Sequence, residues 1–448
     1  MAVVSPFAAI RYDARQVGGL DKVLTQPYDK ITPEMQQVYW QRSPYNLAYI
    51  LKGKAGEGDS PADNVYTRAA AYLQKWREQG VLLQRKRPAL YAYSQEFHPP
   101  GASNDSTMVR RGFIGLCNLE SYDSGVVFRH ELTHSGPKLD RLELLRATRA
   151  HFGQIFMVYS DPGQQIDRLL DAEAANAPGI RVTDDFGVIH SLWDIEGPEQ
   201  VQAIQHAMSD KKLIIADGHH RYETALAFQR ECRASRPHEG PSDCSKVMMT
   251  FINMESKGIP VLPTHRLLSG IPEFSSAGFL SRAARYFAGR EYAYSGPDQR
   301  RSVMQRLQAD MAAASASGLT AIAALFADQE AFYLLQLREG VDRASLLPEL
   351  SPAQRSLDVT ILHQIAFRLC LGMDEEAVRD EKWIAYVREF EEGVEKVAGG
   401  KAQACFFLNP VKLQQVRDVA FEGRVLPQKS TDFYPKLLSG LTIYQMES

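Results

Sequence analysis

Long apolar runs, paired cysteines and an excess of basic residues are all missing from this sequence. Its 448 residues contain no uninterrupted apolar run of membrane-spanning length, which argues against a transmembrane helix. The five cysteines form no C-x-x-C pair, and their odd number favours reduced thiols over a disulfide framework or a zinc knuckle. A formal net charge of −3 argues against bulk binding of nucleic acid.

The N-terminus also lacks the features of a signal peptide. No basic residues precede its first apolar residues, and Pro6 follows early. The content of 44% hydrophobic and 23% charged residues is typical of a soluble globular protein. We therefore expect a cytoplasmic protein with small-molecule partners, without nucleic acid or membrane partners, and with homo-oligomerisation left open.

Strand-like and helical patterns are mixed along the chain. Alternating residues predict hairpins within 89–119 and 180–195 and a strand pair at 320–326 and 331–337, and buried strands are expected at 154–160 and 246–255. Helical spacing predicts helices at 140–152, 298–316 and 353–371. Because strands and helices do not alternate strictly, we predict an α+β fold with mixed multi-stranded sheets.

The length is too great for one ordinary core, so two or three domains are expected, or one domain with large insertions. The segment 289–299, with its Ser-Gly-Pro, is the best candidate linker. We predict an N-terminal region at 1–125, a core at 126–288 and a C-terminal region at 289–448.

The stretch LIIADGHHRYETAL at 213–226 predicts a buried strand, a turn and a helix. Gly218 permits a positive φ or a close backbone approach, and the unpaired N–H groups of a first helical turn attract anions. His219, His220 and Arg221 would add donors there. Asp217 could cap the helix, hold Mg²⁺ or act as a base. An ordinary capped helix with solvated polar residues is the alternative.

His130-Glu131-Leu132-Thr133-His134 matches the H-E-x-x-H zinc pattern. A zinc helix has to continue through both histidines, whereas Ser135-Gly136-Pro137 should end a helix at that point. We favour a polar loop that enters a pocket, with His130, Thr133 and Lys138 near substrate and Glu131 as a general base. A surface loop with ordinary charges is the alternative.

The C-terminal stretch LPQKSTDFYPKLLSG at 426–440 places Lys429, Ser430, Thr431 and Lys436 near aromatic residues. It lacks the glycines of a P-loop, but a lysine with two hydroxyls could still bind a phosphate. Arg266 follows a strand-like segment and could reach the same anion. Asp29 and Asn46 are further pocket candidates, although such residues in turns often serve the backbone.

Two family resemblances rest on these motifs. The D-G-H-H-R turn resembles the phosphate-binding turn of the ParB/sulfiredoxin-like superfamily, which includes free-serine kinases. The chain from Pro6 to Leu441 resembles the DUF1015 family of uncharacterised bacterial and archaeal proteins. The shared motifs are QPYDKI, SPYNLAYI, HELT with PKLDRLELLRAT, IFMVYSDP, ADGHHRYETAL, VLPTHRLL, FLNP and PQKSTDFYPKLLSGL. The first resemblance implies a ParB/sulfiredoxin-like nucleotide-binding core.

Together these features predict a nucleotide-dependent phosphotransferase that uses ATP or ADP and Mg²⁺. Phosphoryl transfer needs positive charge around the phosphate and a carboxylate for the attacking hydroxyl. Arg221, Arg266 and Lys429 with the two histidines would supply charge, and Asp217 or Glu131 would supply the carboxylate. The resemblance implies a free amino acid such as serine as acceptor. The alternatives are a nucleotide sensor or partner-binding protein without turnover, and a metal-dependent hydrolase built on His130, His219 and His220.

Overall fold

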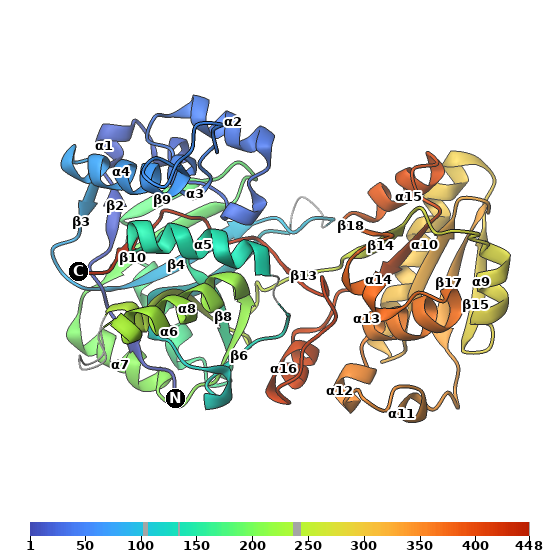
Figure 1. Ribbon diagram of the computed structural model, residues 1–448. Coiled ribbons are helices and arrows are strands. Elements are labelled where there is room, and N and C mark those ends of the chain that lie inside the picture. Colours follow the sequence, from blue (N-terminus) through green and yellow to red (C-terminus); the bar gives the residue numbers. More distant parts are fainter. Residues whose placement is uncertain (102–105, 133–134, 236–242, 448) are drawn as a thin grey trace. The chain divides into compact units, whose positions relative to one another are not determined.

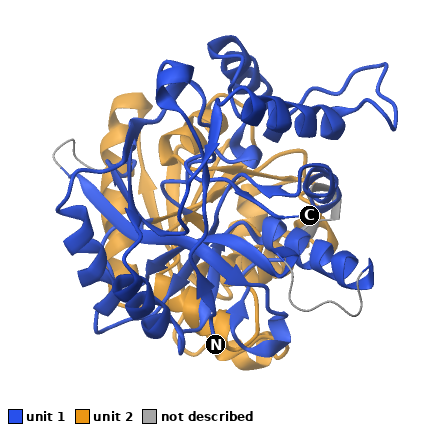
Figure 2. Ribbon diagram, turned by 90° about the vertical axis from the view of Figure 1, so that its left-hand side faces the viewer, with its two compact units in different colours: residues 1–260, 433–448 blue, residues 261–432 orange. Residues whose placement is uncertain are grey.

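The chain divides into two compact units in the computed structural model (Figures 1 and 2), which describes residues 1–101, 106–132, 135–235 and 243–447. Unit 1 comprises Met1–Pro260 and Phe433–Ser448, and unit 2 comprises Val261–Asp432. Strands and helices are mixed within both units, so the predicted α+β class is confirmed. Within the described ranges, no helix is both long and apolar enough to cross a bilayer.

Unit 1 is built on a mixed sheet with the strand order β6-β11-β8-β12-β5-β4-β10-β9, and β1 pairs with β5. β6 runs parallel to β11 and β8 runs parallel to β12. The strands of unit 1 are β1 Val4–Ser5, β2 Ile10–Tyr12, β3 Leu82–Gln84, β4 Leu90–Phe97, β5 Met108–Asn118, β6 Val127–Phe128, β7 Ala150–His151, β8 Ile155–Tyr159, β9 Ile180–Thr183, β10 Ile189–Ile195, β11 Leu213–Asp217, β12 Lys246–Asn253 and β21 Tyr444–Gln445. Its helices are α1 Ala14–Val17, α2 Pro33–Arg42, α3 Ala48–Leu51, α4 Val65–Glu78, α5 Ser135–Thr148, α6 Gln165–Ala174, α7 Pro198–Met208 and α8 His219–Ser235.

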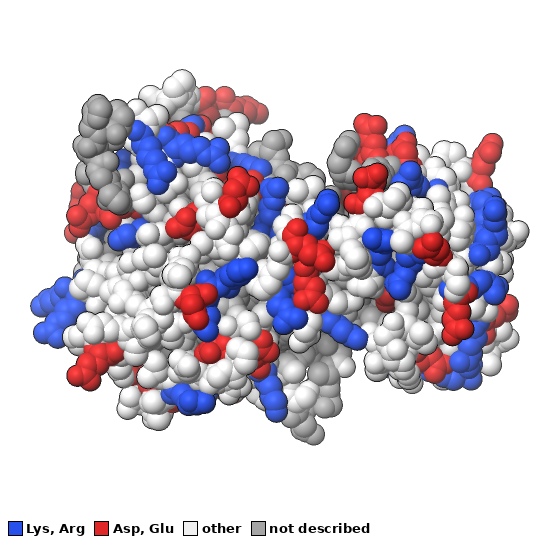
Figure 3. Space-filling view, turned by 90° about the horizontal axis from the view of Figure 1, so that it is seen from below, with Lys and Arg blue, Asp and Glu red and all other residues white. Residues whose placement is uncertain are grey.

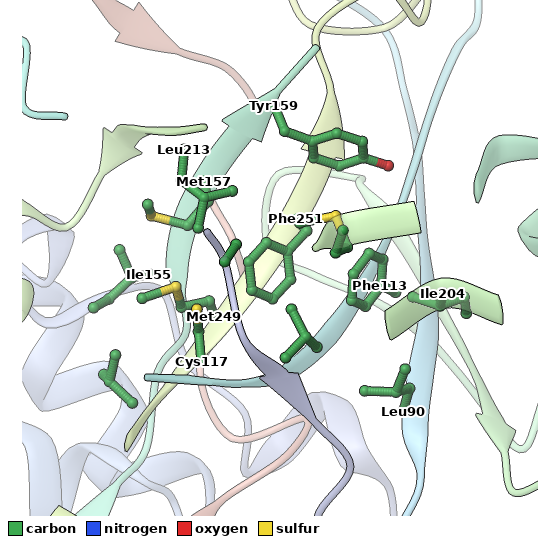
Figure 4. Packing of buried hydrophobic residues seen from close by; sticks show 14 of the residues in the cluster. Leu90, Phe113, Cys117, Ile155, Met157, Tyr159, Ile204, Leu213, Met249 and Phe251 are labelled. Carbon is green, nitrogen blue, oxygen red and sulfur yellow. The ribbon is translucent and has the colours of Figure 1, made fainter. Parts of the chain in front are cut away.

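One face of this sheet forms a hydrophobic core with α6, α7 and α8 (Figure 4). Ile155, Met157 and Tyr159 of β8 point into this core, as do Met249 and Phe251 of β12. The side chains of a strand alternate between the two faces, so the residues between them lie on the opposite face.

The C-terminal segment 433–446 covers that opposite face. Phe433 packs edge-on against Phe156 of β8, with ring centroids 5.6 Å apart. Thr442 Oγ1 lies 3.3 Å from Met248 Sδ of β12. The last residues of the chain are therefore part of the structure of unit 1, beside strands formed much earlier in the sequence.

Unit 2 contains an antiparallel sheet with the order β15-β17-β16-β19-β14-β18. Helices α10 and α15 pack on one face, and α9 and a π-helix supply Phe279 and Phe367 against Phe406 on the other. Its strands are β13 Val261–Leu262, β14 His265–Leu268, β15 Phe287–Ala293, β16 Ile322–Phe326, β17 Ala331–Leu337, β18 Ile384–Val387 and β19 Ala404–Leu408, and β20 spans Asp432–Phe433. Its helices are α9 Ser276–Ala283, α10 Gly296–Ala316, α11 Arg343–Leu346, α12 Pro352–Arg355, α13 Asp358–Ile361, the π-helix Leu362–Cys370, α14 Glu375–Arg379, α15 Phe390–Ala398 and α16 Leu413–Phe421.

The local patterns predicted most elements but not their grouping. The hairpins β4–β5 and β9–β10 and the pair β16–β17 occur as expected. The sheet of unit 1, however, runs across the predicted border after residue 125, because β4 and β5 pair with strands from later in the chain. The predicted linker 289–299 was wrong, since it forms the end of β15 and the start of α10 inside unit 2.

The helix expected at 353–371 is divided into α12, α13 and the π-helix. The helix expected at 140–152 begins earlier, at Ser135. The expectation that Ser135-Gly136-Pro137 ends a helix was therefore wrong, because these residues open α5. A proline in the first turn needs no backbone donor, so it is tolerated there.

Replacing Phe251 by alanine should lower the free energy of unfolding of unit 1 by ~3–5 kcal/mol, the usual cost of such a cavity. Phe251 is fully buried, and its ring stacks on Phe113 at 4.8 Å. The matched control is Phe186→Ala in an exposed turn, which should change stability by less than about 0.5 kcal/mol. Urea unfolding followed by tryptophan fluorescence would measure both, and equal effects would contradict the core assignment.

Candidate functional site

The D-G-H-H-R stretch forms the predicted strand, turn and helix. β11 ends at Asp217, Gly218 has a φ of 95°, and α8 begins at His219. The pairing of β11 with β8 shifts register between Ile215 and Asp217. Strict alternation would direct Asp217 into the apolar core beside Ile215, and a bulge of this kind re-aims a side chain.

Two cations hold the Asp217 carboxylate. Lys436 Nζ donates to Oδ1 at 2.7 Å, and Arg221 Nη2 donates to Oδ2 at 2.7 Å. The three side chains are 13–19% exposed. Burial alone would raise the pKa of Asp217, but Lys436 and Arg221 together keep this pKa well below its usual range. Asp217 is therefore ionised at neutral pH, and the cluster carries one excess positive charge.

Arg221 folds back over the turn that precedes its own helix. A Cβ added at Gly218 would lie 3.0–3.1 Å from the guanidinium of Arg221, so the absence of a side chain there gives the arginine its place. Arg221 Nη1 also donates to the backbone carbonyl of Gln154. The guanidinium thus joins β11, the start of α8 and the loop before β8.

His219 and His130 form a buried pair beside this cluster. Their rings meet edge to face at 4.7 Å, and His219 Nε2 lies 3.4 Å from the backbone N–H of His130. Burial lowers the pKa of both imidazoles, that of His219 most strongly, and the proximity of His130 lowers it further. Both histidines are therefore neutral at pH 7, so His219 does not add the positive charge that the sequence suggested for it in this turn.

Glu131 lies next to the histidine pair. Its Oε1 is 3.9 Å from His130 Nε2, and its side chain is 25% exposed. His130 Nδ1 is 2.6 Å from the carbonyl of Ile215 in β11, so the loop 130–132 is fastened to the strand that carries Asp217. The structure thus brings Glu131, His130 and the D-G-H-H-R turn together. Residues 130–132 are not helical, which disfavours the zinc-helix interpretation, and Thr133 and His134 lie outside the described residues.

Buried polar residues fix the segment that carries Lys436. Arg110 is 1% exposed, and its guanidinium donates to the carbonyls of Tyr434 and Pro435. Gln95 Nε2 donates to the carbonyl of Lys436 at 2.9 Å and its Oε1 accepts from Arg110 Nε at 3.0 Å. Because burial lowers the pKa of Arg110 only to about 10, its charge persists at neutral pH. These bonds position the Lys436 backbone opposite Asp217.

A cleft of about 580 Å³, including its open mouth, lies beside this cluster in unit 1 and is called the unit 1 cleft. Tyr28, Arg141, Arg221, Thr224 and Ser439 are among its polar lining residues. The guanidinium carbon of Arg141 sits 4.3 Å from the centre of the Tyr28 ring. Burial and nearby Asp29 raise the pKa of Tyr28, so its hydroxyl stays protonated. The cleft therefore combines two arginines, an aromatic ring and hydroxyl groups.

The other predicted pocket residues of unit 1 lie outside this cluster or have structural roles. Lys138 pairs with Glu223 of α8. Asn46 is fully buried. Its Nδ2 donates to the carbonyl of Lys22, and its Oδ1 accepts from the backbone N–H of Ala48. Asp29 is exposed in a 3₁₀ turn. His220 is half-buried in the first turn of α8.

Arg266 and the PQKST stretch belong to unit 2. The Arg266 guanidinium is buried and donates to the carbonyls of Thr264, Gln428 and Lys429. Arg266 therefore has a structural role, since it holds the turn that contains Lys429. Ser430 is buried and donates to the carbonyl of Pro427, whereas Lys429 is exposed and Thr431 is half-buried. The convergence of these residues with the D-G-H-H-R turn stays a prediction.

Asp217 fits a metal ion poorly in this arrangement. Both of its oxygens accept from cations, and two neighbouring positive charges oppose a third. Among the residues with described positions, no group of three or more His, Cys, Asp or Glu side chains is placed to hold a metal ion. Mg²⁺ usually needs fewer protein ligands and binds with substrate phosphates, so Mg²⁺ at Asp217 stays a prediction that this geometry does not favour.

Sequence reasoning missed several residues of this site. A lysine beside two hydroxyls favours Lys429, yet Lys436, farther along the same motif, pairs with Asp217. Tyr28 and Arg141 line the unit 1 cleft although turn and helix patterns give them ordinary roles. Arg110 lies in a strand pattern with nothing to mark it as buried. Of these residues, only Lys436 had a sequence signal for a place in the site, because it lies in the PQKSTDFYPKLLSG motif.

Figure 3 shows Lys and Arg interspersed with Asp and Glu over the face that it displays. Arg221 and Lys436 are mostly buried by comparison, with 17% and 13% of their side chains exposed. The positive charge is therefore suited to a small anion that enters a pocket.

Comparison with known proteins identifies a family but no activity. The model of the family described as "Protein of unknown function (DUF1015)" matches residues 4–360. Comparison with curated proteins gives no match. Among solved structures, a free serine kinase in complex with AMP is 11% identical, with a TM-score of 0.35 over 73% of this chain and 89% of that chain.

Two further structures are similar at the same level. A free serine kinase variant in complex with ADP is 11% identical, with a TM-score of 0.37 over 78% of this chain and 96% of that chain. A conserved hypothetical protein from Pyrococcus furiosus is 10% identical, with a TM-score of 0.33 over 71% and 92%. At these values the likeness carries no inference about the ligands or activity of this chain.

Replacing Lys436 by methionine should lower the free energy of unfolding of unit 1 by ~1.5–3 kcal/mol at pH 7, because a hydrogen bond to a charged group typically contributes this much. The lowered pKa of Asp217 stabilises the folded state above the ordinary carboxyl pKa, and this contribution is lost as pH falls through the lowered value. The difference in the free energy of unfolding between Lys436→Met and wild type should therefore become smaller in strong acid. Urea unfolding at pH 7 and at acid pH would measure it.

The exposed Lys86→Met variant is the control and should leave stability nearly unchanged. Combining Lys436→Met with Asp217→Asn should give less than the sum of the two single effects, because both remove the same ion pair. Strict additivity of the two substitutions would show that the pair does not contribute.

Proposed function

The chain belongs to the DUF1015 family of proteins of unknown function, and we propose that it is a nucleotide-dependent phosphotransferase that binds phosphate at the start of α8. The observation that carries the proposal is the cluster of Arg221 and Lys436 around one carboxylate, Asp217. This cluster leaves an excess positive charge in a mostly buried place at a helix N-terminus, where anions are favoured.

The unit 1 cleft lies beside the cluster and opens to solvent, with about 580 Å³ of empty space when its open mouth is included. Arg221 and Arg141 line it with the Tyr28 ring. Guanidinium groups match phosphate oxygens in geometry, and an aromatic ring offers a surface for a nucleobase.

Glu131 is the better candidate for the general base. A general base works best with a pKa near the working pH, whereas Lys436 and Arg221 keep the pKa of Asp217 very low. Glu131 is partly exposed, and its Oε1 lies 3.9 Å from His130 Nε2, beside the D-G-H-H-R turn. In the proposed reaction the acceptor oxygen forms a bond to the γ-phosphorus, the bond to the ADP oxygen breaks, and the hydroxyl proton passes to Glu131.

Asp217 then has a positioning role. It orients Arg221 and Lys436 before the nucleotide binds, and preorganised charge of this kind lowers the cost of stabilising a developing anion. The free amino acid acceptor, such as serine, follows from the resemblance of the D-G-H-H-R turn and remains part of the proposal. The role of Lys429, Ser430 and Thr431 as further phosphate ligands also remains part of it.

A nucleotide sensor without turnover is the second candidate. Both cations of the cluster already bind Asp217, so a phosphate that recruits them has to loosen existing ion pairs. Such an exchange is a local two-state change that a ligand can drive, and it needs no chemical step.

Replacing Arg221 by lysine should weaken ATP binding at least about ten-fold, because the two-pronged guanidinium geometry is lost while the charge remains. Titration calorimetry with ATP, ADP and AMP on the full chain would measure this. The control is Arg230→Lys, an exposed arginine on the same helix, which should change the affinity by less than about two-fold. Equal affinities of wild type and Arg221→Lys would refute the phosphate site.

Glu131→Gln should lower turnover by about 10²–10⁴-fold while leaving ATP binding intact, because it removes a proton acceptor and not a phosphate ligand. ADP release with ATP and a panel of amino and hydroxy acids, serine included, would measure turnover. ATP binding without consumption across the panel would favour the sensor. Wild-type rates in Glu131→Gln would show that the base is another group.

A further inference from the structure

Unit 2 contains a separate polar cleft of about 570 Å³, including its open mouth, which is called the unit 2 cleft. Its wall comes from segments far apart in the sequence. They are the start of β14, the end of α10, the start of α13, the end of β19 and the turn before β20. The motifs VLPTHRLL, FLNP and PQKST all reach it, through Thr264, Asn409 and Ser430.

Arg266 builds one wall of this cleft. Its Nη2 donates to the carbonyls of Gln428 and Lys429 at 3.2 and 3.1 Å. Its Nε donates to His363 Nε2 at 3.3 Å. These bonds hold the turn that places Ser430 at the cleft. Arg266 therefore shapes the cleft, and its charge adds to the potential inside it.

Asp358 is the carboxylate of the unit 2 cleft. It is half-buried at the start of α13, and in the described part of the chain its Oδ2 accepts a long hydrogen bond, 3.3 Å, from the backbone N–H of Ala321. Burial raises the pKa of Asp358 to about 7, against smaller opposing effects of the Ala321 N–H and Lys412. A carboxyl group that is poorly solvated in an open cleft gains from a hydrogen-bond donor on a ligand.

Lys412 supplies a cation across the same cleft. Its Nζ donates to the carbonyl of Ser315 at 2.8 Å, and the residue is exposed. An ammonium group has three donors, so this one bond leaves it able to bind an anion as well. Lys412 directly precedes α16, whose N-terminus adds positive potential.

We propose that the unit 2 cleft binds a small carboxylate that also carries a hydroxyl or amino group. The ligand carboxylate pairs with Lys412, and its hydroxyl or ammonium donates to Asp358. With Arg266 in the wall the charged lining residues sum to one positive charge, which favours an anionic or zwitterionic ligand over a cation. The hydroxyls of Thr264, Thr320 and Ser356 also line the cleft and add donors and acceptors for a polar ligand.

Titration calorimetry on the full chain with serine, glycerate, propionate and glycerol tests the proposal. Serine and glycerate carry both groups and should bind, whereas propionate lacks the donor and glycerol lacks the carboxylate, so both should bind at least about ten-fold more weakly. Asp358→Asn and Lys412→Met should each weaken glycerate binding by a similar factor. The control is Asp418→Asn, an exposed carboxylate on α16, which should change binding by less than about two-fold.

The pH dependence gives a second readout. Glycerate has no titrating amine, and Asp358 accepts its hydrogen bond best when ionised, so binding should strengthen about ten-fold from pH 6 to pH 8. Lys412 and Arg266 are the other charged residues that line the cleft, and burial keeps His363, which contacts Arg266, neutral by lowering its pKa. The Asp358→Asn variant should show no such dependence.

The proposal fails on any of three results. They are the absence of binding by both serine and glycerate, equal binding by propionate and glycerol, and wild-type affinity with an unchanged pH profile in Asp358→Asn. Asp217→Asn separates the two sites, because it should leave glycerate binding intact. Glycerate binding that is lost in Asp217→Asn and kept in Asp358→Asn would assign the ligand to unit 1 and overturn the proposal.

Discussion

The candidate site of unit 1 depends on one ion-pair cluster, in which Asp217 holds Arg221 and Lys436 together. The carboxylate comes from the end of β11, the second strand in the order of the sheet, the arginine from the following helix and the lysine from the C-terminal segment. A buried carboxylate with a single partner would be costly, and two partners with good geometry offset its desolvation. The cluster therefore joins β11, α8 and the C-terminal segment and concentrates positive charge at the start of α8.

Much of the surrounding structure supports this arrangement. Arg110 and Gln95, buried on neighbouring strands, bind the backbone around Lys436. The register shift in β11 turns Asp217 out of the apolar core, and Gly218 leaves space for the Arg221 guanidinium. His130 is fastened to β11 and brings Glu131 beside the turn. Residues that touch no ligand in the proposed reaction thus determine where the charged groups lie.

The two units place polar chemistry in similar kinds of position. In unit 1 the charged groups gather where β11 ends and α8 begins, and in unit 2 the cleft lies where β19 ends and α13 begins. Ends of strands and starts of helices leave backbone groups without partners in the regular ladder. Polar side chains therefore collect at these ends, where the apolar cores stop, and clefts with mixed charge form there.

The sequence by itself determined the local features of this protein. Four apolar residues followed by Asp217-Gly218 specify a strand, a turn and a helix, because periodicity and the permissive φ of glycine act over a few residues. Tertiary structure alone decided that Lys436 meets Asp217, that Arg266 holds a backbone turn, and that β4 and β5 join the later strands in one sheet. The physical reason is that pairing, burial and the resulting pKa shifts depend on residues distant in the chain, which leave no periodic signal in the sequence.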